Sequence, residues 1–391
     1  MVHEIQLPIS KSIANRYLLL SALGGTAPVP LPHDALLPND VRVMRALLLQ
    51  SDTENYNVHD AGTVFRFLTA YLSVQPGTHR LSGTETLNKR PIAPLVNALR
   101  SLGASVTYAS AEGEAPLIIE GRILTGGSIT ADASISSQFV SALMLIAPTL
   151  AQGLRLYLPG RVSSRTYITL TQKCLLDYGV QVQTDEQCIY IPPQKIQSCN
   201  TPVEHDWSSA AFWYALCAIT GRSFSLPGLN TGSMQADAQT PHFFDRLGVQ
   251  TRQTPLGIEI SRAHEIEKDL AFDLSGQPDM APALIVACAA LGLKATFTGL
   301  HTLAFKESDR TLALQQELKK LNIHFTREGE VWKLDATGVQ WQATELHTYN
   351  DHRLAMAFMC FTALHPGISI ENPECVAKSY PRFIHHFNTV F

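Results

Sequence analysis

Six short polar or charged clusters recur along this chain, and the pattern after each one predicts an apolar helix rich in alanine and leucine. From the second cluster onward the starts are about seventy residues apart, and such a fixed spacing indicates an internally repeated architecture. Each cluster stands where a helix N-terminus would present backbone N–H groups and a positive dipole end to an anion. The six segments are SKSIANRYLLLSAL (10–23), DAGTVFRFLTAYL (60–72), SSQFVSALMLIAP (136–148), DWSSAAFWYALCAI (206–219), PDMAPALIVACAAL (278–291) and NDHRLAMAFMCFTAL (350–364).

A second, amphipathic helix is predicted in each repeat, ending shortly before a strand. Gly103, Gly179 and Gly248 fit the left-handed residue that closes a helix, and Asn322 tolerates the same conformation. The alternating stretches 104–108 and 180–183 predict strands. Similar helices also arise from composition alone, so the repeat needs support from chemistry.

The six repeats divide most simply into two domains of three. The polar stretch before Asp206 places the boundary near residues 202–206. We therefore predict one domain at residues 10–204 and a second at residues 1–9 plus 205–391, with the first few residues returning to the second domain as a strand.

Composition limits what this chain can do. With 391 residues, of which 45% are apolar, it is long enough for two or three globular domains. The net charge of −4 argues against a nucleic-acid binder with a broad basic surface. The seven cysteines contain no CxxC pair, which favours a reducing compartment. No signal peptide or apolar run of membrane-spanning length is visible, so we expect a cytoplasmic protein without a membrane partner.

Charged residues make up only 16% of the chain, yet they concentrate beside the apolar helices. Lys and Arg are rarely buried without a partner, and a cleft for a substrate with several negative groups would supply one. Arg suits bidentate contacts with phosphate or carboxylate, and Lys acts as a point charge. The cations are Lys11, Arg16, Arg66, Arg90, Lys306, Arg310, Arg353 and Lys378; the hydroxyls and amide are Ser12, Thr63, Ser136, Ser137, Gln138, Ser164 and Tyr167; the acids are Asp60, Asp206, Asp279, Glu307 and Asp309.

Each cluster also has a simpler interpretation. Ser136 and Ser137 are good helix N-caps, and KESDR (306–310) has the composition of a solvated charge run. Asp351 would cap a helix whether or not it does chemistry, which would leave His352 and Arg353 exposed on the first turn. The fourth cluster, with Asp206, Ser208 and Ser209, has the weakest claim to chemistry.

The order of these segments along the whole chain resembles that of the 3-phosphoshikimate 1-carboxyvinyltransferase (EPSP synthase) family. The most specific segments are the opening SKSxxxR, KESDR and DHRxAM. The segments that carry the resemblance are SKSIANR (10–16), AGTVFRFLTA (61–70), KRP (89–91), SSQFVSAL (136–143), SRTY (164–167), DWSSAAF (206–212), PDMAPAL (278–284), KESDR (306–310), NDHRLAM (350–356) and AKSYP (377–381).

The resemblance implies an α/β fold of two similar domains, each with three βαβαββ units, with helices inside, sheets outside and the active site in the interdomain cleft. It implies transfer of the enolpyruvyl group of phosphoenolpyruvate to the 5-hydroxyl of shikimate 3-phosphate, with release of phosphate. The reaction passes through a tetrahedral intermediate by addition and elimination, and it belongs to the shikimate pathway to chorismate. No metal or organic cofactor is implied, and we expect a monomer whose partners are these two small molecules.

The resemblance also assigns roles to residues. Asp279 would take the 5-hydroxyl proton, Glu307 would protonate the methylene carbon of phosphoenolpyruvate and later deprotonate the methyl group, and Lys11 would share this work. The implied phosphoenolpyruvate ligands are Lys11, Gly62, Arg90, Gln138, Arg310, Arg353 and Lys378. The implied shikimate 3-phosphate ligands are Lys11, Ser12, Arg16, Ser136, Ser137, Gln138, Ser164, Tyr167, Asp279 and Lys306. Weaker candidates are Asp60, Thr63, Arg66, Thr302 and His352.

The chain departs from the family pattern at a few positions. Asp60 and Thr302 stand where the family usually has Asn, Ala304 where it has Arg, and Phe67 where Pro is common. One rival is the UDP-N-acetylglucosamine enolpyruvyl transferase family, but Glu85 stands where that family usually has a catalytic Cys. A second rival is a non-catalytic anion-binding homologue, against which the presence of the proton-transfer candidates argues.

Overall fold

The structure is a computed structural model that describes residues 2–33, 36–50, 54–131, 136–160, 164–185 and 187–391. Its described residues divide into two compact domains. The amino-terminal domain comprises residues 11–33 and 39–203, and the carboxy-terminal domain comprises residues 2–10, 36–38 and 204–391. The resemblance implies that the first domain makes most of the shikimate 3-phosphate contacts and that the second supplies the proton-transfer acids and the phosphoenolpyruvate clamps, and this division stays a prediction.

The repeating unit is seen most simply in the second repeat. Helix α3 connects the parallel strands β2 and β3, and α5 leads into the antiparallel pair of β4 and β5, which gives the strand order β2-β3-β5-β4. The elements are β2 (Asn55–Asn57), α3 (Gly62–Ser73), β3 (Gly77–Ser82), α4 (Glu85–Asn88), α5 (Ala93–Ser101), β4 (Ser105–Tyr108) and β5 (Leu117–Gly121).

Three further sheets have the same pattern, with the orders β6-β7-β9-β8, β1-β10-β12-β11 and β13-β14-β16-β15. The third repeat contains β6 (Gly127–Thr130), α6 (Ser137–Ile146), η2 (Ala147–Thr149), β7 (Leu154–Tyr157), α7 (Arg165–Asp177), β8 (Gln183–Thr184) and β9 (Cys188–Ile191). The fourth contains β1 (Val2–Glu4), α8 (Trp207–Thr220), β10 (Ser223–Pro227), η3 (Ala236–Gln239), α9 (Thr240–Asp245), β11 (Val249–Thr254) and β12 (Gly257–Arg262). The fifth contains β13 (Leu270–Asp273), α10 (Ala281–Ala290), β14 (Lys294–Thr298), η4 (His301–Phe305), α11 (Arg310–Lys319), β15 (His324–Glu328) and β16 (Val331–Asp335).

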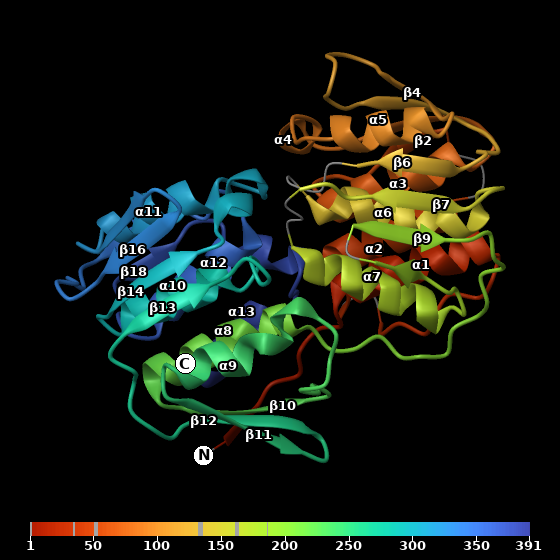
Figure 1. Cartoon of the computed structure of the whole chain (residues 1–391). Coiled ribbons are helices and arrows are strands. Elements are labelled where there is room, and N and C mark those ends of the chain that lie inside the picture. The colour runs from red at the N-terminus through yellow and green to blue at the C-terminus, as the bar shows by residue number, and fades with distance from the viewer. Residues whose placement is uncertain (1, 34–35, 51–53, 132–135, 161–163, 186) are drawn as a thin grey trace. The chain divides into compact units, whose positions relative to one another are not determined.

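The first strand belongs to a sheet whose other strands lie more than two hundred residues later. β1 pairs in parallel with β10, with Val2 opposite Ser223 and Glu4 opposite Ser225. The predicted return of the first residues as a strand is therefore confirmed. Figure 1 shows this sheet against α8 and α9, and both ends of the chain lie in this domain.

The mixed α/β class is confirmed, but among the residues that the structure describes the complete βαβαββ pattern is present in four of the six repeats. The described part of the first repeat has α1 (Lys11–Gly24) and α2 (Asn39–Leu49) and no strand, because about fifty residues are too few for the full unit. The sixth has a single parallel pair, and its last segment is helical rather than a hairpin. Its elements are β17 (Thr344–Leu346), α12 (His352–Thr362), β18 (Ile368–Ile370), η5 (Pro373–Lys378) and α13 (Phe383–Val390).

The helices that open the repeats form the centre of each domain. In the carboxy-terminal domain α8, α10 and α12 pack against one another, and α10 is buried at every residue except its last. In the amino-terminal domain α1, α3 and α6 pack together in the same way. A helix that is apolar on all sides must be covered on all sides. The sheets provide that cover, since β13 buries Leu270 and Phe272 and exposes Ala271 and Asp273.

The predicted helix ends are confirmed. Gly103, Gly179, Gly248 and Asn322 all have positive φ, between 56° and 91°, just after α5, α7, α9 and α11. The strand predicted at 104–108 is β4, which begins one residue later. The strand predicted at 180–183 is wrong in position, because β8 begins at Gln183.

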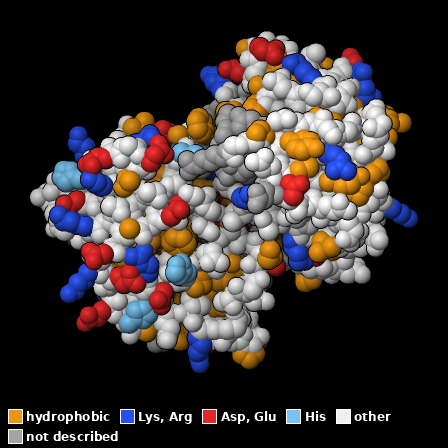
Figure 2. Space-filling model, viewed as in Figure 1, with side chains coloured by type: hydrophobic (Ala, Val, Ile, Leu, Met, Phe, Trp, Pro, Cys, Tyr) orange, Lys and Arg blue, Asp and Glu red, His pale blue; other side chains and the backbone are white. Residues whose placement is uncertain are grey.

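Charged side chains of both signs are interspersed over the face of the molecule shown in Figure 2. Within the described part of the chain, every helix is too short or too polar to pass through a membrane.

Candidate active site

Arg310 is the first residue of α11, and three carboxylates enclose its guanidinium. Nε donates to Asp351 Oδ2 at 2.7 Å and Nη2 to Asp351 Oδ1 at 3.2 Å. Nη1 donates to Asp279 Oδ1 at 3.1 Å, and Nη2 donates to Glu307 Oε2 at 2.9 Å. Arg310 is 1% exposed, so the solvated interpretation of KESDR is wrong at this residue.

The start of α11 directs Arg310 inward. Asp309 caps the helix by accepting from the backbone N–H of Leu312 at 3.0 Å, and Asp309 itself remains exposed. Burial alone would lower the pKa of Arg310, but the charges of Asp351, Glu307 and Asp279 raise it. The guanidinium therefore remains a cation and holds three acids from separate segments in one place.

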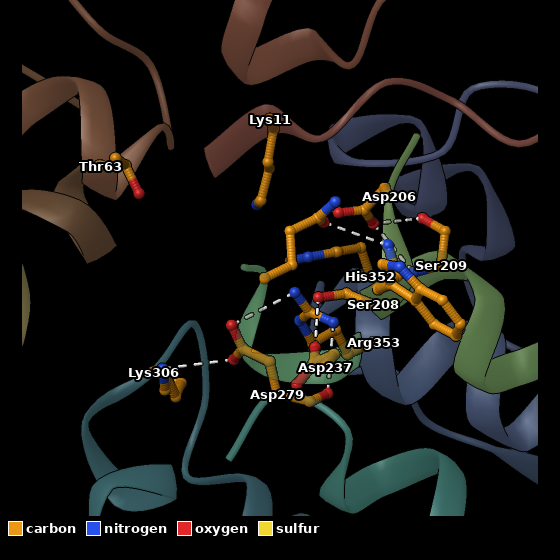
Figure 3. Close-up of polar contacts among 12 residues, drawn as sticks. Lys11, Thr63, Asp206, Ser208, Ser209, Asp237, Asp279, Lys306, His352 and Arg353 are labelled. Atoms are coloured by element: carbon orange, nitrogen blue, oxygen red, sulfur yellow. Dashed lines mark hydrogen bonds and ion pairs between the residues drawn. The ribbon is translucent and has the colours of Figure 1, made fainter. Parts of the chain in front are cut away.

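Asp279, just before α10, contacts three cations. Besides Arg310, its Oδ1 lies 3.3 Å from Lys306 Nζ and its Oδ2 lies 3.3 Å from Arg353 Nη2. Arg353 also donates from Nη1 to the Asp279 backbone carbonyl at 3.2 Å. Figure 3 shows Lys306 and Arg353 reaching this carboxylate from different elements. The side chain is 15% exposed, so the carboxylate is open to a ligand on one side.

Glu307 is held through both of its oxygens. Oε2 accepts from Arg310, and Oε1 lies 3.9 Å from Nζ of Lys378. Lys378, at the end of η5, is only 4% exposed, whereas the Glu307 side chain is 16% exposed. The acid is therefore reachable, while its cationic neighbours are almost fully enclosed.

The N-terminus of α12 contributes Asp351 and Arg353 to the charged network around Arg310. Asp351 caps the helix by accepting from the Arg353 N–H at 2.9 Å, and it also accepts from Ser308 Oγ at 3.2 Å. The capping interpretation is thus confirmed, but the accompanying exposure is wrong: His352 is 1% and Arg353 4% exposed. Asp351 was not predicted from the sequence as a partner of Arg310, because an acid at a helix start is so often only a cap.

Asp237 was also missed. Ser208, on the first turn of α8, donates its hydroxyl hydrogen to Asp237 Oδ2 (Figure 3). Asp237 lies in η3 and is 2% exposed. Burial raises its pKa to about 6, with Asp279 and Asp206 adding to the rise, and Arg353 and Ser208 opposing it. Nothing in the local sequence SMQAD distinguishes this acid from an ordinary turn residue.

Asp206, in contrast, has the role expected of a helix cap. Its Oδ2 accepts from the backbone N–H of Ser209 at 2.8 Å and from the Ser209 hydroxyl at 2.6 Å. These contacts fix the start of α8, and thereby the position of Ser208.

In the amino-terminal domain, Arg16 is enclosed by neutral acceptors. Nε donates to Thr171 Oγ1 at 2.8 Å, Nη1 to the Ser12 carbonyl at 2.7 Å, and Nη2 to Ser141 Oγ at 3.2 Å and the Tyr167 carbonyl at 3.4 Å. Its guanidinium carbon lies 5.2 Å from the centroid of the Phe67 ring, and burial lowers its pKa. Arg16 therefore ties α1 to α6 and α7, besides any contact that it makes with a ligand.

Two arginines lie against the start of α3. A Cβ built on Gly62 would lie 2.8 Å from Arg90 Nη1 and 2.9 Å from Arg66 Nη1. Arg66 is further fixed by donating to the Gly62 carbonyl at 3.0 Å and to the Pro91 carbonyl at 2.9 Å. A glycine at a helix N-terminus beside two guanidinium groups is suited to a phosphate or carboxylate.

The first turn of α6 contacts α3. Gln138 Nε2 donates to Thr63 Oγ1 at 3.2 Å, and the Ser136 hydroxyl caps α6 by accepting from the Gln138 N–H at 3.2 Å. Ser137 is 5% exposed. The capping interpretation of Ser136 is therefore confirmed, and it leaves Gln138 beside α3.

Four other predicted residues lie at or close to helix starts. Lys11, the first residue of α1, donates to Asp40 Oδ2 of α2 at 3.0 Å. Ser164 has φ of 53° at the start of α7, where its carbonyl accepts from the Tyr167 N–H at 3.0 Å. Asp60 is exposed in the turn before α3, and Thr302 is 6% exposed in η4, with a hydroxyl that has no hydrogen-bond partner among the described residues.

The carboxy-terminal domain thus brings six predicted residues into one charged network: Asp279, Lys306, Glu307, Arg310, Arg353 and Lys378. The amino-terminal domain brings Gly62, Thr63, Arg66, Arg90 and Gln138 around the start of α3. Such sites offer cations for a substrate with several negative groups, and carboxylates for proton transfer. Among the described residues no group of three or more His, Cys, Asp or Glu side chains has an arrangement suited to a metal ion.

The fold is that of the enolpyruvyl transferases. The EPSP synthase of Acinetobacter baumannii superposes with a TM-score of 0.76 at 22% identity over 99% of this chain and 95% of that one. The enolpyruvyl transferase NikO of Streptomyces tendae superposes with a TM-score of 0.71 at 14% identity over 100% and 94%. At these identities the likeness shows the fold alone.

Sequence comparison assigns the family. The family model for EPSP synthase (3-phosphoshikimate 1-carboxyvinyltransferase) matches residues 39–387. The 3-phosphoshikimate 1-carboxyvinyltransferase of Bacteroides fragilis strain YCH46 is 42% identical over 388 residues, 97% of this chain and 93% of that protein. That of Marinomonas sp. strain MWYL1 is 31% identical over 418 residues, 99% and 96% of the two chains. The chain belongs to the EPSP synthase family.

Proposed function

We propose that this chain transfers the enolpyruvyl group of phosphoenolpyruvate to the 5-hydroxyl of shikimate 3-phosphate, and that the networks around Arg310 and Gly62 carry out the reaction. The family supplies the overall reaction. The observation that carries the choice of residues is the Arg310 cluster, where two partly exposed acids are held by almost fully buried cations.

The first task of the site is to bring two polyanions together. Two unit charges about 4 Å apart repel by about 4 kcal/mol at an effective dielectric constant near 20. Cations fixed before the substrates arrive remove this barrier and orient both partners. Arg310 is fixed by three acids and Arg66 by two backbone carbonyls, so both are preorganised.

The second task is proton transfer. Asp279 takes the proton of the 5-hydroxyl as its oxygen attacks C2 of phosphoenolpyruvate, and Glu307 gives a proton to C3, which becomes a methyl group. The tetrahedral intermediate then loses phosphate, which takes up the proton held by Asp279, while Glu307 removes a proton from the methyl group to restore the double bond. Both acids are 15–16% exposed, as groups that meet a substrate must be.

We assign the remaining predicted residues to binding. Phosphoenolpyruvate is held by Lys11, Gly62, Arg90, Gln138, Arg310, Arg353 and Lys378. Shikimate 3-phosphate is held by Lys11, Ser12, Arg16, Ser136, Ser137, Gln138, Ser164, Tyr167, Asp279 and Lys306. The contacts that support this assignment are the two guanidinium groups at Gly62 and the closure of Arg16 onto α7.

The rival acceptor, UDP-N-acetylglucosamine, has less support. Glu85, at the position where that family usually has its Cys, is exposed and forms an ion pair at 2.7 Å with Lys89, the residue that follows the short α4. A carboxylate at this position cannot replace the thiol of the catalytic Cys in the rival family.

A phosphate-release assay tests the proposal. Purified protein is expected to release phosphate only when phosphoenolpyruvate and shikimate 3-phosphate are both present. Release with UDP-N-acetylglucosamine in place of shikimate 3-phosphate would contradict it.

The finer expectations on assembly and location also remain proposals: a monomer, in the cytoplasm. Sedimentation equilibrium that returns about twice the chain mass of 42.9 kDa would contradict the monomer.

A further inference from the structure

Asp237 is a buried acid for which the reaction above has no use. Its Oδ2 accepts from the Ser208 hydroxyl, but its Oδ1 is buried without a hydrogen-bond partner among the described residues. A buried acceptor without a hydrogen bond destabilises the folded protein by about 1–3 kcal/mol. We therefore looked for a donor that could reach Oδ1 in another state of the protein.

Arg353 is the donor with the right chemistry. Its charge acts on Asp237, and Figure 3 shows the two side chains next to each other. In this structure Arg353 is engaged with Asp279, through the side chain at 3.3 Å and the backbone carbonyl at 3.2 Å. A guanidinium has five N–H groups, enough to serve two acids and a ligand.

The proposed reaction weakens the bond between Arg353 and Asp279. When Asp279 accepts the 5-hydroxyl proton it loses its negative charge, and its hold on Arg353 falls at the moment when phosphoenolpyruvate needs that cation in place. A second acid beside Arg353 would keep the guanidinium from moving.

We propose that Asp237 is this second partner: a positioning residue that takes over Arg353 through its free Oδ1 when Asp279 is released to act as a base. This inference rests on the proposed function of Asp279 and Arg353. Its chemical content is that one arginine is shared between a carboxylate that reacts and a carboxylate that does not.

The charge on Asp237 is what matters for this role, and it depends on pH. Burial holds the pKa of Asp237 near 6, with Asp279 and Asp206 raising it and Arg353 and Ser208 lowering it. The acid is therefore mostly neutral at pH 5 and mostly charged at pH 8. Only the charged form is a strong second partner for Arg353.

The test compares wild-type protein with Asp237→Asn, which keeps the shape and an acceptor for Ser208. The ratio of wild-type to variant kcat/KM for phosphoenolpyruvate, at saturating shikimate 3-phosphate, is expected near 1 at pH 5 and about 10 at pH 8. Ionisation of phosphoenolpyruvate cancels in this ratio. A role in packing alone would give a ratio that does not change with pH, which would overturn the inference, as would a ratio that falls.

Ser208→Ala provides a second variant with the carboxylate intact. Because the Ser208 hydrogen bond lowers the pKa of Asp237, its removal is expected to move the midpoint of the pH dependence upward. An unchanged or lower midpoint would also overturn the inference. If wild-type protein shows no turnover with the two substrates, the proposed function fails; if it turns over and the ratio is flat, this inference alone fails.

Discussion

Arg310 Nε lies 2.7 Å from Asp351 Oδ2, and neither side chain is more than 1% exposed. The pair joins the start of α11 to the start of α12, forty-one residues apart in the chain. Since Arg310 also holds Asp279 and Glu307, this one contact fixes the frame in which both proposed proton-transfer acids sit.

Replacement of Arg310 by lysine is expected to damage both folding and activity. Lysine keeps the charge but loses the planar fork that serves three acids at once, so buried carboxylates lose partners. We expect a loss of about 3–5 kcal/mol in the free energy of unfolding, measured by urea denaturation. Arg252→Lys is the matched control, because Arg252 pairs with Glu259 on the surface and is 73% exposed. Equal stability of the two variants would contradict the role given to Arg310.

Glu307→Gln is expected to lose most of its turnover while it still binds shikimate 3-phosphate. The amide keeps an acceptor for Arg310 but cannot shuttle the proton to and from C3. Calorimetry measures the binding, and the phosphate-release rate measures the turnover. Glu328→Gln, at an exposed residue that pairs with Lys333, serves as a control. Unchanged turnover in Glu307→Gln would remove this acid from the mechanism.

Gly62→Ala is expected to raise KM for phosphoenolpyruvate about tenfold, with a smaller effect on kcat. The added Cβ would lie 2.8 Å from Arg90 Nη1 and 2.9 Å from Arg66 Nη1, so one or both guanidinium groups must move. A change of about 1.4 kcal/mol in the binding of an anion gives that factor. Gly232→Ala is the control, because the nearest atom there is 3.4 Å away. An unchanged KM would show that neither arginine binds this substrate.

Acid is expected to destabilise the protein through His386. Its Nδ1 bonds Tyr380 Oη at 2.8 Å, it is 8% exposed, and burial lowers its pKa to about 4, with Arg382 and His385 adding to the effect. Because the folded pKa is below the unfolded value of about 6.5, the unfolded state takes up a proton first as the pH falls. Stability is therefore lost from pH 6.5 toward 4, by at most about 3 kcal/mol.

The pKa shift of Asp237 changes stability with pH in the opposite direction. Its folded pKa near 6 lies above the unfolded value of about 3.9, so its contribution is present in acid and is lost as the pH rises toward 6. The two groups are separated by comparing wild type with His386→Gln. Urea denaturation of the variant should show a smaller acid loss between pH 6.5 and 4. An identical acid loss would mean that His386 does not titrate as described.

Local patterns in the sequence were enough to predict where the repeat-opening helices begin, whereas the roles of the site residues came from the family resemblance and stay predictions. Asn322 and the glycines after α5, α7 and α9 have the predicted left-handed backbone, because that conformation depends on one residue and its helix. The local pattern could not show whether a charged side chain points into the protein or toward solvent. KESDR reads equally as a solvated run, and only the distant Asp279 and Asp351 show that Arg310 points inward.

The residues that were not predicted escaped notice for the same reason. Asp237 is joined to Ser208 across twenty-nine residues, and Asp351 to Arg310 across forty-one. Neither contact leaves a periodic signal, because it depends on how segments that are distant in the sequence pack together.

The most direct test of the account follows the atoms of the reaction by nuclear magnetic resonance. Purified protein is mixed with phosphoenolpyruvate and shikimate 3-phosphate at neutral pH. The phosphorus spectrum should show the phosphoenolpyruvate signal replaced by that of inorganic phosphate at equal molar yield. The signal of the 3-phosphate ester on the acceptor should keep its intensity. The proton spectrum should show new vinyl signals on the acceptor. Phosphate release without those vinyl signals, or no release with both substrates present, would contradict enolpyruvyl transfer by this chain.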